Sequence, residues 1–338
     1  MYLAQLLSLT GLAAAVAVPR QASTQECTNP VKRVEFRTLD AATRKQYTDA
    51  VMCLSTKPSS IGLNTSLYDD FTYVHTHLNS KIHYVASFLP WHRYFTYLYE
   101  KQLNACGYTG PMVYWDWTLD VANVAGSDFW DPVNGVGGNG GKKVETTSDG
   151  RSWSCLLDGP FKDLRPAYSL TEYAPHCLSR DFFDGTSRPG NMRASGYTPE
   201  LIKEMNILPD FKSFEFRLEN VPHGSIHSAV GGQSGDLGPS SSPNDPIFFM
   251  HHAQVDRLWT LWQQADPETR NNDYVGIRER LETNGNATAP SGGNSTQLTP
   301  EQNPPAALTD MMPFMGLADD IPVSDVMTTQ NSLLCYTY

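Results

Sequence analysis

Histidines are unevenly distributed along this chain of 338 residues. Eight of the nine lie in two windows, residues 75–92 and residues 223–252, and only His176 falls outside them. Clustered imidazoles favour copper, nickel or zinc, whereas iron and manganese sites of helical proteins rely on carboxylates. Among these three metals, copper alone changes oxidation state readily with dioxygen. The two windows therefore predict two metal sites, with oxygen-dependent redox chemistry as the function that fits their ligands best.

Spacing within each window fits ligands that lie on helices. His223 and His227 are four residues apart in PHGSIH, which places both rings on one face of a helix. His83 and His92 flank the segment FLP, which fits one ligand near the end of a helix and the next in the first turn of another. Each spacing alone is a weak signal, and an ordinary histidine pair explains HxxxH better than a metal does. The combination favours metal, because each window supplies an adjacent helix pair with inward histidines, and neither contains a cysteine ligand or an HExxH motif.

Helical patterns surround both windows. The clearest runs over residues 244–264, NDPIFFMHHAQVDRLWTLWQQ, and an earlier helix over 39–54 follows Asp40, a good N-cap. Further helices are expected at about 68–84 and 90–104, with Gly107 ending the second. Two three-histidine sites that face each other need four helices. We therefore predict a mainly α fold, an antiparallel four-helix bundle holding the metal centre, with long loops and a few short strands.

Several segments have loop or strand composition. Residues 123–160 and 180–200 are rich in Gly, Asn, Ser and Asp and are expected to be loops. Residues 283–306 are polar and of low complexity, which predicts an exposed loop. The last residues, VMTTQNSLLCYTY, have strand-like composition.

Charge and cysteine content restrict the partners and the compartment. The net charge of −11 and the pI near 5.2 argue against a nucleic-acid or anionic-membrane partner. Residues 1–17 are uncharged and end in Ala-Val-Ala, which predicts a signal peptide, with a short pro-segment to about residue 20. Six cysteines suit an oxidising compartment and allow three disulfides in any of 15 pairings, and sequons occur at Asn64, Asn286 and Asn294. We expect a secreted, extracellular protein with its functional domain at residues 21–338.

The motifs resemble those of a known family, the type 3 copper proteins, which comprise tyrosinases, catechol oxidases and hemocyanins. The first copper-binding region is matched by HTHLNSKIHYVASFLPWHRYFTYLYEKQL and the second by PHGSIH and NDPIFFMHHAQVDRLW, with YWDWT between them. Together with DAVMCL, DDFTYVH, CGYTGPMVYWDW and DGPF, the resemblance covers most of residues 33–265. It is strongest to short secreted fungal polyphenol oxidases, and it implies a helical core with two copper ions.

The resemblance also assigns ligands by position. Those of the first copper are His75, His83 and His92, and those of the second are His223, His227 and His252. His75 is preferred to His77 because the family places this ligand about eight residues before the next. In the pair His251 and His252 the family's ligand is the second, which leaves His251 as a helix residue or a hydrogen-bond donor beside the site.

Neighbouring residues have a structural and a functional interpretation. Phe88 and Phe248 are either ordinary core residues or walls of the copper pocket. Arg93 and Asp256 either orient the ligand helices through hydrogen bonds or form a peripheral ion pair. Three further residues are expected to be structural only: Trp115 and Trp117 pack in the core, and His176 is a surface or hydrogen-bonded histidine.

The implied activity is oxidation of a small phenol by dioxygen. An o-diphenol, or a related o-aminophenol or methoxyphenol, becomes an o-quinone while oxygen is reduced to water. In the family, an Asn after the first ligand of the second copper helps a nearby Glu to hold a water that deprotonates monophenols. Here Gly224 occupies that position and Glu219 supplies the carboxylate. Because glycine cannot orient a water, we expect diphenol oxidation with weak or absent monophenol hydroxylation.

Two features of the sequence depart from the family pattern. Lys81 stands where many fungal relatives have a cysteine bonded by a thioether to the second ligand. The chain ends at the Tyr-Thr-Tyr motif that closes the family's catalytic core, so no C-terminal shielding domain is expected. The alternative functions are a true tyrosinase, a hemocyanin-like oxygen carrier, and a dizinc hydrolase or structural metal protein.

Overall fold

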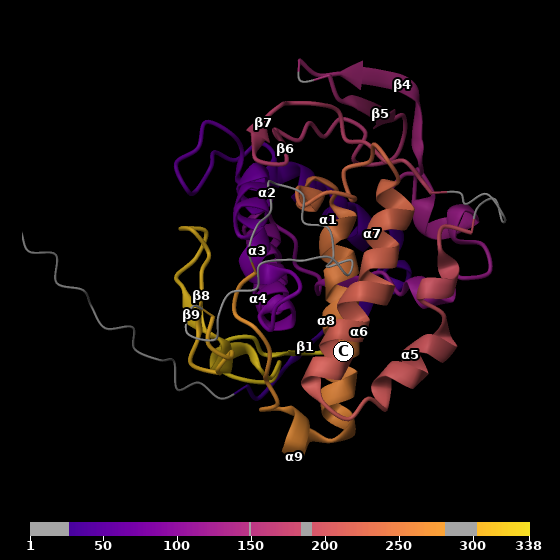
Figure 1. Cartoon of the computed structure of the whole chain (residues 1–338). Coiled ribbons are helices and arrows are strands. Elements are labelled where there is room, and N and C mark those ends of the chain that lie inside the picture. The colour runs from indigo at the N-terminus through magenta and orange to yellow at the C-terminus, as the bar shows by residue number, and fades with distance from the viewer. Residues whose placement is uncertain (1–26, 149, 184–190, 281–302) are drawn as a thin grey trace, which may run out of the picture.

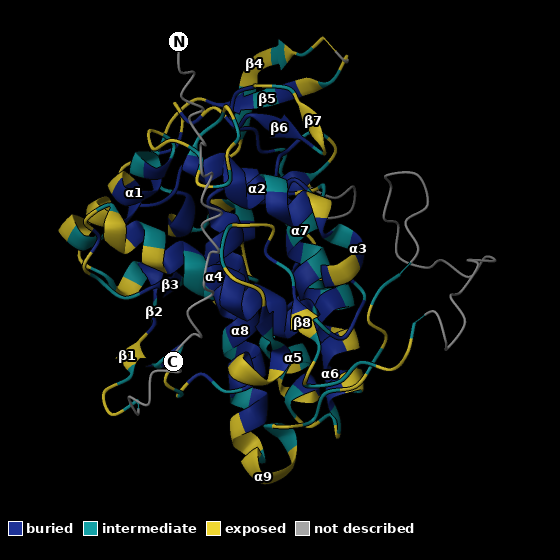
Figure 2. Cartoon of the chain, turned by 90° about the vertical axis from the view of Figure 1, so that its left-hand side faces the viewer, coloured by how far each residue is buried: buried dark blue, intermediate teal, exposed yellow. Residues whose placement is uncertain are grey.

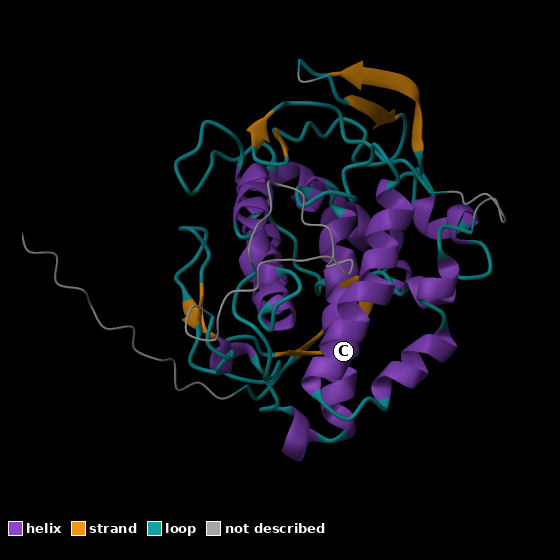
Figure 3. Cartoon of the chain, viewed as in Figure 1, coloured by secondary structure: helices purple, strands orange, loops and turns teal. Residues whose placement is uncertain are grey.

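The computed structural model describes residues 27–148, 150–183, 191–280 and 303–338. Helices make up most of the core and short strands lie around it (Figure 3), so the predicted mainly α class is confirmed. The antiparallel four-helix arrangement and the domain boundaries stay predictions. The proposed signal peptide, the sequons at Asn286 and Asn294 and most of the predicted 283–306 loop lie outside the described residues, whereas Asn64 is described and exposed.

The helices follow one another along the chain as labelled in Figure 1. The α-helices are α1 (Ala41–Leu54), α2 (Leu67–His77), α3 (Asn79–Ile82), α4 (Phe88–Ala105), α5 (Pro199–Asn206), α6 (Phe211–Leu218), α7 (Gly224–Gly231), α8 (Ile247–Ala265) and α9 (Pro267–Arg270). A π-helical turn, η6 (Glu219–His223), joins α6 to α7. Short 3₁₀ turns are η1 (Phe36–Thr38), η2 (Trp117–Leu119), η3 (Val124–Gly126), η4 (Asp128–Trp130), η5 (Ala194–Gly196), η7 (Ser242–Asn244) and η8 (Val323–Val326).

The strands form separate two-stranded pairs. Two pairs are parallel: β1 (Val31–Lys32) with β10 (Tyr336–Thr337), and β2 (Val34–Glu35) with β3 (Val113–Tyr114). Three are antiparallel: β4 (Gly140–Thr146) with β5 (Ser152–Leu156), β6 (Tyr168–Ser169) with β7 (Glu172–Tyr173), and β8 (Met311–Met312) with β9 (Ile321–Pro322). Through β1 and β10, the first described strand and the last lie side by side.

Local sequence signals explain where the helices begin and end. The Asp40 carboxylate accepts a hydrogen bond from the backbone N–H of Thr43 and caps α1 as predicted. Ser66 and Asp69 form a reciprocal capping box at the start of α2. Gly107, with φ of 91°, follows α4 in the left-handed region that favours glycine. The helices α4 and α8 are mostly buried and pack against each other at the centre of the molecule (Figure 2).

Two expectations about secondary structure were wrong. The helix predicted over 68–84 ends at His77, and after the short α3 the backbone of His83 is extended, with φ of −126° and ψ of 137°. The region 123–160 is not only loop, because it contains the β4–β5 hairpin. Its Gly- and Ser-rich composition hides strands that tertiary contacts stabilise, among them the disulfide from Cys155 to Cys177.

All six cysteines form disulfides, which confirms the expected number and gives the pairing. The bonds join Cys27 to Cys335, Cys53 to Cys106, and Cys155 to Cys177. No sulfur is left for a thioether to His83. Among the described residues we find no helix with the length and apolar composition needed to cross a bilayer.

A buried charge network joins α4 to α8. Arg93 of α4 donates from Nε to the carboxylate of Asp256 on α8 at 2.5 Å, and neither side chain is more than 1% exposed. Arg33 donates to the same carboxylate at 3.3 Å, and the hydroxyls of Tyr336 and Tyr338 donate to it as well. Burial alone would raise the pKa of Asp256, but the two guanidinium groups outweigh it and lower that pKa below its ordinary value. The interpretation of Arg93 and Asp256 as a peripheral pair was therefore wrong.

We expect Asp256→Asn to lower the free energy of unfolding by about 3–5 kcal/mol, because it leaves the buried guanidinium of Arg93 without its counter-charge. Chemical denaturation followed by circular dichroism measures the loss. Asp49→Asn is the matched control, since Asp49 pairs with Lys45 on the exposed face of α1 and its loss should leave stability nearly unchanged. Equal losses in the two variants would contradict this role of the network.

Candidate metal centre

The first histidine window forms a compact buried group. His75 lies on α2, His92 in the second turn of α4, and His83 in the extended residue after α3. One nitrogen from each of the three rings lies within 4.8 Å of the others, and no ring is more than 8% exposed. By contrast, His77 is exposed, stacks on Tyr73 and donates to its carbonyl at 2.7 Å. The structure thus brings together the three residues expected for the first site and leaves His77 outside.

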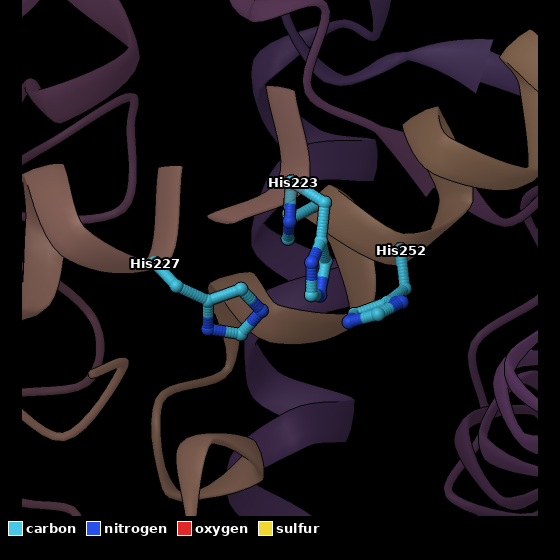
Figure 4. Close-up of side chains that lie close together, drawn as sticks. His223, His227 and His252 are labelled. Atoms are coloured by element: carbon cyan, nitrogen blue, oxygen red, sulfur yellow. The ribbon is translucent and has the colours of Figure 1, made fainter. Parts of the chain in front are cut away.

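The second window forms a group beside the first. His223 ends the π-helical turn, His227 lies one turn later on α7, and the pair His251 and His252 lies on α8. One nitrogen from each of the four rings lies within 4.8 Å of the others. The rings of His223, His227 and His252 point toward one another (Figure 4). His252 also stacks on His92 with ring centroids 4.2 Å apart, so the two groups face each other.

Hydrogen bonds at Nδ1 fix the tautomer of four rings. His75 donates to the carbonyl of Ser240 at 2.6 Å and His92 to that of Phe88 at 2.8 Å. Because a carbonyl can only accept, the proton of each ring is on Nδ1 and its Nε2 carries a lone pair. These two Nε2 atoms face each other at 3.2 Å. Two lone pairs at this distance repel, and a cation bound by both removes the conflict.

The second group repeats this pattern. His223 donates from Nδ1 to the Glu219 carbonyl at 3.0 Å, and His227 to the Leu237 carbonyl at 2.6 Å. Within the described ranges, the buried Nε2 atoms of both rings have no protein partner, and neither nitrogen of His252 has one. Buried polar atoms are rarely left unpaired. Such lone pairs fit a metal ion that three imidazoles share.

Trp117 distinguishes the two adjacent histidines of α8. Its indole N–H donates to Nδ1 of His251 at 3.3 Å, which places the proton of that ring on Nε2. A protonated nitrogen cannot bind a metal, so His251 could ligate only by giving up this arrangement. His252 carries no such restriction. Trp117 was expected to be a packing residue, and the sequence offered no signal for this hydrogen bond.

Burial keeps the imidazoles neutral. It lowers the pKa of His75 to about 3 and that of His227 to about 4. For three further rings burial is again the largest cause, and neighbouring histidines lower the pKa further; these are His83, His223 and His252. Neutral imidazole is the form that binds metal, so both groups are ready to ligate at neutral pH.

A cavity of about 500 Å³ opens onto both groups. Gly224 lies in its wall, and a Cβ atom at this position would meet only the Glu219 carbonyl at 3.4 Å. The carboxylate of Glu219 accepts the backbone N–H of Tyr84, with N to O distances of 2.8 and 2.9 Å. Burial and then Glu215 raise the pKa of Glu219 well above its ordinary value. Glu215, which sequence reasoning missed, therefore makes it costly for both carboxylates to be ionised.

Aromatic rings separate the two groups from the rest of the core. Phe88 lies 4.8 Å from His223 and 4.9 Å from His92, measured between ring centroids. Phe248 lies 4.2 Å from His252 and 5.0 Å from His75. Each phenyl ring thus contacts histidines of both groups, which favours the interpretation of these residues as walls of the metal centre.

Two facing groups of neutral, buried imidazoles on a helical core define the type 3 dicopper class of proteins. Sequence comparison gives the family. The family model described as the common central domain of tyrosinase matches residues 65–265. The chain therefore belongs to the tyrosinase family, an outcome that confirms the resemblance.

Individual relatives agree with this assignment. The chain is 40% identical over 321 residues to the tyrosinase-like protein phomQ2 of Diaporthe leptostromiformis, a match that covers 94% of this chain and 75% of that protein. It is 38% identical over 314 residues to the tyrosinase ustQ of Aspergillus flavus, covering 92% and 80%. A solved polyphenol oxidase from Thermothelomyces thermophila shares 30% identity and a TM-score of 0.69, covering 91% and 88%.

Membership of this family identifies the chain as an oxidoreductase with two copper ions as its cofactor. Enzymes of the tyrosinase type act on phenolic substrates with dioxygen. The predicted oxidoreductase class and its copper ions are thereby confirmed, while the choice between catechol oxidase and tyrosinase activity is a separate question.

Single alanine substitutions distinguish ligands from their neighbours. His92→Ala and His252→Ala should each reduce the copper content from two ions per chain to one, because each removes a lone pair from a three-imidazole set. His77→Ala and His251→Ala are the matched controls and should keep both ions. Elemental analysis of the copper-loaded variants measures the ratio, and loss of an ion from His251→Ala would reverse the assignment on α8.

Proposed function

We propose that this protein is a secreted dicopper polyphenol oxidase that converts o-diphenols to o-quinones while dioxygen is reduced to water. Related o-aminophenols and methoxyphenols belong to the same substrate class. The proposed ligands of the first copper are His75, His83 and His92, and those of the second are His223, His227 and His252.

The hydrogen bonds at Nδ1 support the ligand assignment. Four rings donate from Nδ1 to a backbone carbonyl, which leaves a buried Nε2 lone pair free for a metal; these are His75, His92, His223 and His227. The donor set contains imidazole and neither thiolate nor carboxylate, which suits copper. When bound, the two copper ions supply the electrons for dioxygen and a positive charge that attracts a phenolate.

Stoichiometry follows from electron counting. An o-diphenol gives up two electrons and two protons when it becomes an o-quinone. Dioxygen takes up four electrons and four protons when it becomes two waters. Two diphenols are therefore oxidised for each dioxygen consumed.

The phenol reaches the metal centre through the cavity lined by His83, His223 and Gly224.

Gly224 is the observation that favours diphenols over monophenols. Monophenol hydroxylation requires removal of the phenolic proton, which an ordered water beside a carboxylate performs in the family. Gly224 has no side chain to hold such a water, and both oxygens of Glu219 already accept the Tyr84 N–H.

The second candidate is monophenol hydroxylation by a true tyrosinase, which the names of the relatives phomQ2 and ustQ favour.

Secretion has independent support. Three disulfides require oxidising conditions to form and persist. The sequon residue Asn64 is exposed, as N-glycosylation requires. The uncharged N-terminal segment is the expected export signal.

Oxygen consumption with two substrates in parallel tests the proposed activity. The copper-loaded protein should consume oxygen with catechol at once, and it should consume little or none with tyrosine. An oxygen electrode follows both reactions. Uptake with neither phenol, at two copper ions per chain, would rule out the oxidase and favour an oxygen carrier. Prompt uptake with tyrosine would favour the second candidate.

Substitution at Gly224 tests its role directly. Gly224→Asn should increase tyrosine hydroxylation relative to catechol oxidation, because the amide can hold a water beside Glu219. A change of about 100-fold would lie at the lower end of the range for one general-base contribution. Gly224→Ala is the matched control, since it adds a Cβ that fits the open space but no polar atom. Equal ratios in both variants would show that this position does not control the choice of phenol.

A further inference from the structure

The ninth histidine, His176, forms a buried ion pair outside the metal centre. Its Nε2 lies 2.9 Å from Oδ1 of Asp236, and both side chains are 0% exposed. Its Nδ1 lies 2.6 Å from the carbonyl of Ala174. A carboxylate and a carbonyl can only accept, so both ring nitrogens donate and the ring is an imidazolium. The indole of Trp153 stacks on it with centroids 3.8 Å apart, which suits a cation.

The environment of this pair stabilises its charges. Burial alone would lower the pKa of His176, but the Asp236 carboxylate outweighs it and raises that pKa above its ordinary value. The expectation that His176 is a surface or hydrogen-bonded histidine was therefore half right: it is hydrogen-bonded, but completely buried.

Asp236 begins a segment, residues 236–244, that the pair holds in place. Its Oδ2 accepts the backbone N–H of Ser179 at 2.8 Å, and its own N–H donates to the Ser179 carbonyl at 2.8 Å. At the other end of the segment, Nδ2 of Asn244 donates to Oδ1 of Asp236 at 3.0 Å. The carboxylate of Asp236 thus connects the two ends of the segment to each other and to the backbone of Ser179.

Segment 236–244 contacts both histidine groups. The carbonyl of Leu237 accepts the Nδ1–H of His227, and the carbonyl of Ser240 accepts the Nδ1–H of His75, each at 2.6 Å. Thr76 also donates to the Ser240 carbonyl, at 3.0 Å. One short segment therefore sets the ring orientation of one proposed ligand in each copper site.

From these contacts we propose that His176 and Asp236 are positioning residues for both copper sites, acting through segment 236–244. This inference rests on the proposed ligands His75 and His227. If the pair is broken, the buried carboxylate loses its counter-charge and its hold on the segment, and the two carbonyls no longer constrain the rings. Partners of this kind typically change metal affinity about 10- to 100-fold.

Copper affinity is the readout that separates positioning from mere support of the fold. His176→Gln and Asp236→Asn should each weaken copper binding at both sites by about tenfold, the lower end of the range for such partners. Equilibrium competition of the full chain with a Cu(I) chelator measures both constants.

Val51→Ala is the matched control. Val51 is buried in α1, outside segment 236–244, so the change should destabilise the fold and leave both copper constants unaltered. Two results would overturn the proposal: unchanged constants in both single variants, or a loss at one site only. His75→Ala and His227→Ala test the ligand assignment separately. If these keep both copper ions, the assignment fails, whatever His176 does.

Discussion

The structure depends on one constraint: six imidazoles must stay neutral while their lone pairs converge on two points. Burial supplies neutrality, since it lowers the pKa of rings such as His75 and His227 far below neutral pH. Orientation requires an acceptor for the opposite nitrogen, and backbone carbonyls provide it for four of the rings: His75, His92, His223 and His227. Hydrophobic packing therefore cannot build this centre alone. The chain must also bring particular carbonyls to particular rings.

The helices that carry the rings are held by charges that lie away from the cavity. Arg93 and Asp256 join α4 to α8, and the two C-terminal tyrosines add hydroxyls to the same carboxylate. The disulfide from Cys27 to Cys335 and the β1–β10 pair keep these tyrosines beside the core. A buried ion pair is weak evidence for stability in general, but breaking one is costly. The network thus keeps α4 and α8, and with them His92 and His252, in register.

The sequence predicted what depends on residue type and periodicity. It gave the boundaries of α1 and α8 to within a few residues, and it placed all six proposed ligands in the two groups that the structure assembles. It did not predict the extended backbone of His83 or the β4–β5 hairpin, because both depend on tertiary contacts. Nor did it indicate the acceptors at Leu237 and Ser240. A carbonyl is present at every residue, so only the fold determines which one meets a ring.

The two sites share a division between local and distant support. In each, one ring donates to the carbonyl four residues earlier, as His92 does to Phe88 and His223 to Glu219. Such contacts belong to a single helical segment and form with it. The orientation of a second ring in each site depends on segment 236–244. His75 donates to Ser240, which is far away in the sequence, and His227 donates to Leu237, which lies across a loop from α7. The local contacts orient one ring of each copper site independently of the other site. The shared segment orients one ring in both sites, so a shift of the segment changes the two sites together. A reaction that needs both copper ions at once gains from this arrangement. If His75 or His227 moves together with its carbonyl acceptor, the segment moves as well, and with it the carbonyl that orients the ring in the other site.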